Sequence, residues 1–142
     1  MNVKEICKII PKTATLLPFF EVGIAAGFPS PADDYLERQL DLHELLVEHP
    51  AATFFVRVEG DSMIEAGLQS GDILIVDRSL KPRNGKIVVA LLNGEFTVKR
   101  LKIEDQKLYL LPENPRYQPI EVAEDSDFQV WGVVTYVIHR SG

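Results

Sequence analysis

The chain is short of cysteine and of long apolar runs. It has one cysteine, Cys7, which cannot form a disulfide within the chain, and this usage suits a reducing cytoplasm. No apolar run approaches the roughly 20 residues that a membrane-spanning helix needs. Pro11 and Lys12 interrupt the short apolar stretch near the start, where a signal peptide would carry its apolar segment. We therefore expect a cytoplasmic protein without a membrane anchor.

Positive charge is also scarce. The 142 residues contain 15 Lys and Arg against 21 Asp and Glu, which gives a formal net charge of −6. Such a chain lacks the basic surface with which proteins bind DNA phosphates, so we expect no direct sequence-specific DNA binding. If the protein acts near nucleic acid, we expect a protein partner to mediate that role.

The first 31 residues differ in composition from the rest. They show no sustained hydrophobic period, and they hold several chain-breaking residues: Pro11, Pro18, Gly23, Gly27, Pro29 and Pro31. This composition predicts an extended, mobile N-terminal arm over residues 1–31. Residues 32–142 are then expected to form one folded domain.

The folded part is predicted to be mostly β, with one or two short helices. Helices are predicted over 32–39 and over 41–48, the latter with Asp41 as its N-cap. Asn93-Gly94 indicates a two-residue hairpin, and Gly132 indicates a bulge. The predicted strands, rich in β-branched and aromatic residues, are 53–59, 73–77, 86–92, 95–103, 107–111 and 128–138. This spacing predicts antiparallel sheets that form a barrel-like domain.

Ser62 and Lys99 are the candidate catalytic pair. Ser62 lies in a Gly-Asp-Ser-Met turn after a predicted strand, where backbone N–H groups could stabilise an oxyanion. Taken alone, that turn is more typical of ordinary surface structure. Lys99 lies in the strand 95–103 on the same face as Thr97. A lysine there more often extends to solvent, and it can act as a base only when burial lowers its pKa and leaves it neutral.

The histidines are weaker candidates for a catalytic base. His43, His49 and His139 have no neighbouring carboxylates in a pattern that suggests a triad. Their spacing is that of no known metal motif, and we predict neither a metal nor another cofactor.

Several segments, spaced along most of the chain, resemble the UmuD branch of the LexA-like Ser–Lys peptidases, family S24. The resemblance runs from about residue 17 to residue 137. The segments that carry it include Ala26-Gly27-Phe28-Pro29-Ser30-Pro31, Gly60-Asp61-Ser62-Met63, Gly71-Asp72-Ile73-Leu74-Ile75-Val76-Asp77 and Gly94-Glu95-Phe96-Thr97-Val98-Lys99. The Ala-Gly bond, the Ser-Met turn and the Val-Lys strand are specific in combination and in this order, whereas any one of them alone is not. UmuD itself has Cys-Gly at its cleavage position, whereas this chain has Ala-Gly, as LexA repressors do.

The resemblance implies residue roles and partners. It makes Ser62 the nucleophile, Lys99 the general base and Ala26–Gly27 the bond that the chain cuts in itself. The N–H groups of Ser62 and Asp61 would form the oxyanion hole. It implies a LexA- or signal-peptidase-like fold, a homodimer, stimulation by a RecA–single-stranded-DNA filament, and a role as accessory subunit of an error-prone, UmuC-like Y-family DNA polymerase in the SOS response.

Three alternatives differ in what they require. A LexA-type repressor needs a helix-turn-helix domain, and the 26 residues before Gly27 are too few for one. A signal peptidase shares the Ser–Lys chemistry but needs a membrane anchor. A non-catalytic module that binds the polymerase, with an inert Ser–Lys pair, remains open on the sequence.

Overall fold

The protein is described here from a computed structural model, which places residues 1–9, 16–21 and 36–142. These residues belong to two compact units, one within residues 10–48 and one formed by Met1–Ile9 with His49–Gly142. The smaller unit contains β2 (Leu16–Glu21), β3 (Leu36–Asp41) and α1 (Leu42–Leu46). The larger unit contains β1 (Asn2–Lys8), η2 (Pro50–Ala52), β4 (Thr53–Glu59), η3 (Ile64–Ala66), β5 (Ile73–Asp77), β6 (Ile87–Leu92), β7 (Glu95–Glu104), β8 (Lys107–Leu111), β9 (Ile120–Val122) and β10 (Phe128–Ile138).

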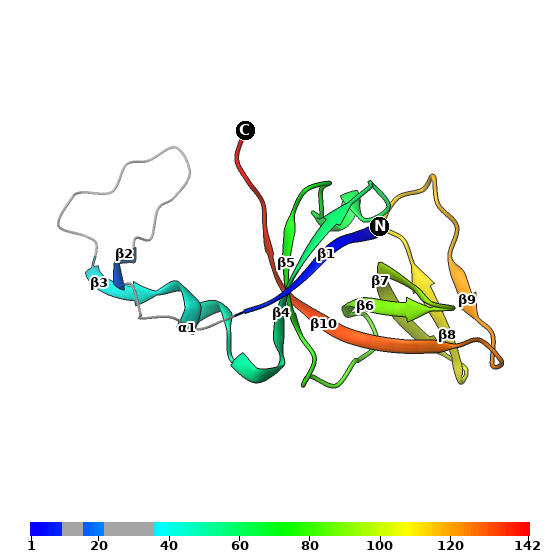
Figure 1. Ribbon diagram of the computed structural model, residues 1–142. Helices are drawn as coiled ribbons and strands as arrows, with labels where there is room; N and C mark the ends of the chain where they lie inside the picture. Colours follow the sequence, from blue (N-terminus) through cyan, green and yellow to red (C-terminus); the bar gives the residue numbers. More distant parts are fainter. Residues whose placement is uncertain (10–15, 22–35) are drawn as a thin grey trace. The chain divides into compact units, whose positions relative to one another are not determined.

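The larger unit is built on an antiparallel sheet that curls into a partial ring. Its strand order is β1-β4-β5-β10-β6-β7-β8-β9, and β1 pairs in addition with β7. That extra pairing joins Asn2 to Thr97 and brings the two ends of a six-strand series together (Figure 1). The predicted mostly β, barrel-like class is therefore confirmed.

Most predicted strands appear at the predicted positions. The strands over 53–59, 73–77, 107–111 and 128–138 have the predicted bounds, and β6 and β7 differ from prediction by one residue. Asn93 and Gly94 both have positive φ, as the tight hairpin between β6 and β7 requires. The pairing of β10 with β6 shifts between Val130 and Gly132, which confirms the predicted bulge.

Two local predictions need correction. Residues 36–39, expected in a helix over 32–39, belong to β3, which pairs with β2. A first turn rich in acidic residues indicated a helix, but strand pairing outweighs such a weak local preference. The second predicted helix forms as α1, shorter than expected, and the Asp41 carboxylate caps it by accepting from His43 N at 3.0 Å.

The start of the chain was expected to be part of a mobile arm, and for residues 2–8 this is wrong. These residues form β1, which pairs with β4 over most of its length. The apolar side chain of Met1 is buried with Val56, Val58 and Met63. The predicted boundary at residue 31 and the bond Ala26–Gly27 lie outside the described residues, so the division into arm and peptidase domain stays a prediction.

Two groups of buried apolar side chains form the interior of the larger unit. One joins Met1, β4, β5 and the start of β7, and the other lies between β6, β8 and β10. Trp131 packs edge-on against Phe54 and Phe96 beside the first group. Ser62 and Lys99 lie at the border of the first group, where water is largely excluded.

Candidate active site

Ser62 stands in a turn directly after β4. Gly60 has a φ of 100°, a left-handed conformation that favours glycine, and it lets the chain turn sharply out of the strand. The loop after β8 holds this turn in place. The Ser62 carbonyl accepts from Glu113 N at 2.7 Å, and the Asp61 carbonyl accepts from the buried Asn114 side-chain amide at 2.9 Å.

Lys99 reaches this serine from β7. Its Nζ lies 3.0 Å from Ser62 Oγ, 3.1 Å from Thr97 Oγ1 and 3.2 Å from the Val98 carbonyl. A neutral amine has two N–H donors and one lone pair. If the N–H groups go to Thr97 and Val98, the lone pair faces the Ser62 hydroxyl, which is the arrangement that a general base needs.

Burial supplies the electrostatic condition for that role. Ser62 is 2% exposed and Lys99 is 6% exposed. Desolvation lowers the pKa of Lys99, although a hydrogen bond with the N-terminal amine acts in the opposite direction. Among the described residues, the hydrogen-bond partners of Nζ are hydroxyl and carbonyl oxygens rather than carboxylates, and burial beside apolar β4 therefore favours the neutral lysine.

The N-terminal amine occupies the space in front of the nucleophile. The Met1 amino group donates to Ser62 Oγ, and the Met1 carbonyl accepts from Val98 N at 2.9 Å and from the Thr97 hydroxyl at 3.2 Å. Burial and the neighbouring Lys99 lower the pKa of this amine from 8.0 to about 4. Nothing in the sequence patterns indicated that Met1 would reach this site.

The predicted pair is thus brought together, while other candidates lie elsewhere. The His49 ring is 2.6 Å from the Asp77 carboxylate and the His139 ring is 2.7 Å from the Asp72 carboxylate, so neither faces Ser62. In the part of the chain that is described, no cluster of three or more His, Cys, Asp or Glu residues could hold a metal ion. The predicted oxyanion donors, the N–H groups of Asp61 and Ser62, stay a prediction.

Sequence reasoning assigned no role at the site to three residues that contact it. Asn114 and Tyr117 both contact Asp61, the first through its carbonyl and the second through its carboxylate at 2.5 Å. Thr97 contacts both Lys99 and Met1. Strand alternation had placed Thr97 on the face of Lys99, whereas no pattern links residues 114–117 to a turn more than fifty positions earlier.

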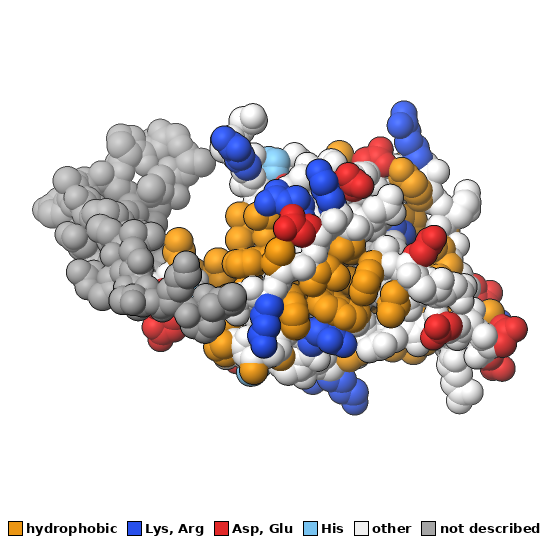
Figure 2. Space-filling model, in the orientation of Figure 1, with side chains coloured by type: hydrophobic (Ala, Val, Ile, Leu, Met, Phe, Trp, Pro, Cys, Tyr) orange, Lys and Arg blue, Asp and Glu red, His pale blue; other side chains and the backbone are white. Residues whose placement is uncertain are grey.

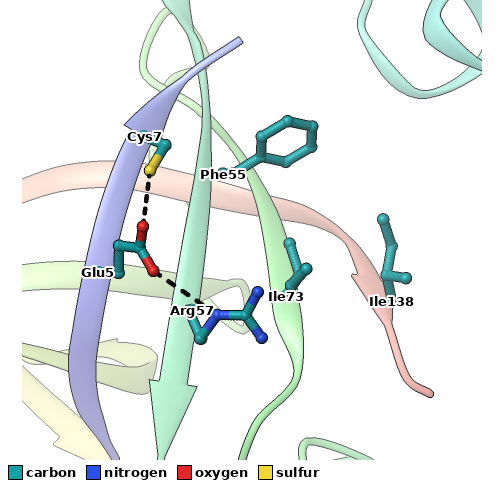
Figure 3. A pocket seen from close by; sticks show the side chains of 6 residues that line it. All are labelled: Glu5, Cys7, Phe55, Arg57, Ile73 and Ile138. Atoms are coloured by element: carbon teal, nitrogen blue, oxygen red, sulfur yellow. Dashed lines mark hydrogen bonds and ion pairs between the residues drawn. The ribbon is translucent and has the colours of Figure 1, made fainter.

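A separate pocket opens on the outside of the sheet. It has a volume of about 280 Å³ and is lined by Glu5, Cys7, Phe55, Arg57, Ile73 and Ile138. Figure 3 shows Glu5 between Cys7 and Arg57, with the three apolar side chains beside them. On the molecular surface, apolar side chains gather in the middle of one face, with charged ones around them (Figure 2). This pocket contains neither Ser62 nor Lys99.

Comparison with known proteins identifies the family. A model of the Peptidase S24-like family matches residues 18–135. The chain belongs to this family. Its members are generally serine peptidases, and the resemblance that the motifs indicated is confirmed.

Individual relatives of this S24 protein cover most of its length. Protein SamA of Salmonella typhimurium is 51% identical over 124 residues, which are 87% of this chain and 86% of SamA. Protein MucA of Escherichia coli is 46% identical over 121 residues, 84% of this chain and 82% of MucA. LexA repressor 1 of Xanthomonas campestris pv. campestris is 45% identical over 118 residues, 82% of this chain but 58% of the repressor. No helix among the described residues is long and apolar enough to cross a membrane.

Proposed function

We propose that this S24 protein is a serine endopeptidase that cuts its own Ala26–Gly27 bond with a Ser62–Lys99 dyad. The observation that carries the proposal is the 3.0 Å approach of Lys99 Nζ to Ser62 Oγ at a buried site. Family membership supports it, since S24 proteins are generally serine peptidases. The lowered pKa of Lys99 also supports it, because only a neutral amine can take the serine proton.

The first half of the reaction forms an acyl-enzyme. Neutral Lys99 accepts the proton of the Ser62 hydroxyl while Oγ attacks the Ala26 carbonyl carbon. The N–H groups of Ser62 and Asp61 stabilise the oxyanion that forms. The bond from Ala26 to the Gly27 nitrogen then breaks, and protonated Lys99 gives its proton to that nitrogen. Small residues at both positions let the substrate backbone approach the nucleophile closely.

The second half releases the arm. Lys99 takes a proton from a water molecule, which attacks the ester carbon, and the proton returns to Ser62 Oγ. The products are residues 1–26 with a new carboxylate and residues 27–142 with a new amino group. Because the substrate is tethered to the enzyme, its effective concentration at an open site is high.

The cleavage acts as a switch in the SOS response to DNA damage. A RecA–single-stranded-DNA filament stimulates it in the cytoplasm, and the 27–142 form acts as a dimeric subunit of a UmuC-like translesion polymerase. The similarity to MucA and SamA along most of the chain supports this assignment. The net charge of −6 agrees with a role through protein partners rather than by direct DNA binding.

Fragment masses test the proposal. The purified protein, incubated at pH 9–10 or with a RecA filament and nucleotide, should give one cut after Ala26. The cut should be absent in Ser62→Ala and in Lys99→Ala. A chain that stays intact under both conditions favours the rival hypothesis, a non-catalytic polymerase-binding module. Cutting that persists in Lys99→Ala contradicts the mechanism.

A further inference from the structure

We infer that the Ser62–Lys99 cleft is a binding site for a peptide strand with a free amino terminus, and that the chain's own residues 1–8 fill it and hold self-cleavage back. This inference rests on the proposed function for its effect on cleavage. The occupancy itself rests on the contacts of β1, which are independent of any reaction.

The first argument is the shape of the sheet around the site. β4 and the first half of β7 each have an edge toward the cleft, and β1 lies between them (Figure 1). β1 pairs with β4 from Asn2 to Lys8 and meets β7 at Thr97. The part of β7 that pairs with β8 begins only at Arg100, so the edge beside Lys99 is available to β1. The ring therefore closes through β1, and this gap accepts one strand.

The second argument is the fit of the first residue. The Met1 side chain is 5% exposed and packs in the core beside Val58 and Met63. Its carbonyl receives two donors from β7, and its amino group donates to the nucleophile. Each polar group of the first residue thus has a partner, which is what a specific site for an amino-terminal residue requires.

The consequence is competition for Ser62. A scissile carbonyl must come within about 3 Å of Oγ to react, and the Met1 amine already occupies that space. The carbonyl of Ala26 can therefore reach Ser62 only after β1 has left the gap.

Releasing β1 should accelerate cleavage. Ile6 packs against the core from β1, and Ile6→Asp places a charge there. We expect this variant to cut itself at least about tenfold faster at pH 9, because the docked strand loses apolar burial. Lys4→Gln is the matched control, since it changes the net charge by the same amount at an exposed position of the same strand. It should cut at the wild-type rate.

Locking β1 should slow cleavage. Glu5 and Arg57 are direct cross-strand partners whose side chains meet at 3.7 Å on the outer face (Figure 3). Directly opposed positions of antiparallel strands have a separation that suits a disulfide. In a Cys7→Ser background, Glu5→Cys with Arg57→Cys should cut at least about tenfold more slowly when oxidised, and reduction should restore the rate. Glu5→Cys alone in that background should not respond to oxidation.

Hydrogen exchange separates this inference from the proposed function. In the intact wild-type protein at pH 7, the amides of residues 3–8 should be protected to a similar degree as those of β4. Fast amide exchange in β1 overturns the inference even if the protein cuts itself. Equal cleavage rates of the oxidised and reduced forms of the variant with Glu5→Cys and Arg57→Cys overturn it as well. If no variant cuts itself, Ile6→Asp included, but the amides of β1 are protected, the proposed function is overturned. The binding of β1 at the cleft is then still supported.

Discussion

The side-chain amide of Asn114 donates to the Asp61 carbonyl at 2.9 Å, and it thereby ties the loop after β8 to the turn that carries the nucleophile. Asn114 is buried, and its own Oδ1 accepts from Arg116 N at 3.0 Å. The neighbouring Glu113 N donates to the Ser62 carbonyl. The position of Ser62 therefore depends on a loop that contributes no reacting group.

Asn114→Ala should impair cleavage without abolishing it. Loss of one hydrogen bond to the partly buried Asp61 carbonyl costs about 1–2 kcal/mol, which corresponds to a roughly fivefold to thirtyfold slower cut if the turn shifts. Cleavage rates at pH 9–10 and urea unfolding of the same samples measure the two effects. Tyr117→Phe removes an exposed bond to the same Asp61 and should have a smaller effect. Equal effects of the two variants would contradict a positioning role for Asn114.

The pH profile should differ between wild type and Ile6→Asp. The general base must be neutral, so cleavage by a free cleft rises about tenfold per pH unit below the pKa of Lys99. Docking of β1 favours the neutral form of the Met1 amine, because burial in the docked state lowers its pKa from 8.0 to about 4. Docking therefore releases a proton, and the affinity of the cleft for β1 increases as pH rises from 4 to 8. Tighter docking slows cleavage, whereas the growing neutral fraction of Lys99 accelerates it.

Wild-type cleavage should accordingly rise less steeply with pH below 8 than cleavage of Ile6→Asp, and the two slopes should become similar above pH 8. The groups that act on the Met1 amine are Lys99, which lowers its pKa further, and Asp61, which raises it. Initial rates from pH 5 to 10, followed by fragment mass, measure both profiles. If the cleavage rates of wild type and Ile6→Asp rose equally steeply with pH below pH 8, docking of β1 would not be linked to deprotonation of the Met1 amine.

Gly132→Ala should destabilise the sheet. A Cβ at position 132 would lie 2.5 Å from Val76 Cγ1 on the neighbouring strand, so either the Val76 side chain or one of the two strands must shift. Overpacking of this kind costs about 1–3 kcal/mol. Urea unfolding followed by the fluorescence of Trp131, the single tryptophan, measures it. Gln129→Ala, at an exposed position of the same strand, should leave the midpoint nearly unchanged.

Asp77 should contribute to acid sensitivity. Burial acts to raise its pKa, but the hydrogen bonds from the Ser79 hydroxyl, His49 and Ser79 N outweigh burial and lower it. A carboxylate with a lowered pKa stabilises the fold above its unfolded value of 3.8, and this contribution is lost as pH falls through the folded value.

The free energy of unfolding of Asp77→Asn should therefore be lower than that of wild type at pH 7 and should fall less between pH 5 and 2. Urea unfolding at several pH values gives both quantities. Asp125→Asn, in an exposed turn, is the control and should follow the wild-type curve. If the free energy of unfolding of Asp77→Asn fell as much between pH 5 and 2 as that of wild type, Asp77 would not be the source of the acid sensitivity.

The sequence by itself determined six of the seven strands of the main sheet from Thr53 onward, β9 being the exception, and it indicated Ser62 and Lys99 as the candidate pair. The strands could be predicted because alternation, β-branched residues and turn residues such as Asn93-Gly94 are local signals. The pair could be predicted because its motifs resemble those of a known family. Local preference failed at residues 36–39, where pairing with β2 rather than a helical first turn decides the structure.

Only the tertiary structure decided what surrounds the pair. Lys99 and Ser62 are 37 positions apart, and their contact exists because β4 and β7 approach each other across the closing ring. The docking of Met1 against Ser62 spans 61 positions, and a Pro-rich start with no period gave no sign of it. Strand pairing and burial at such separations depend on neighbours that no local pattern specifies, and here they place the chain's own first residue at its candidate nucleophile.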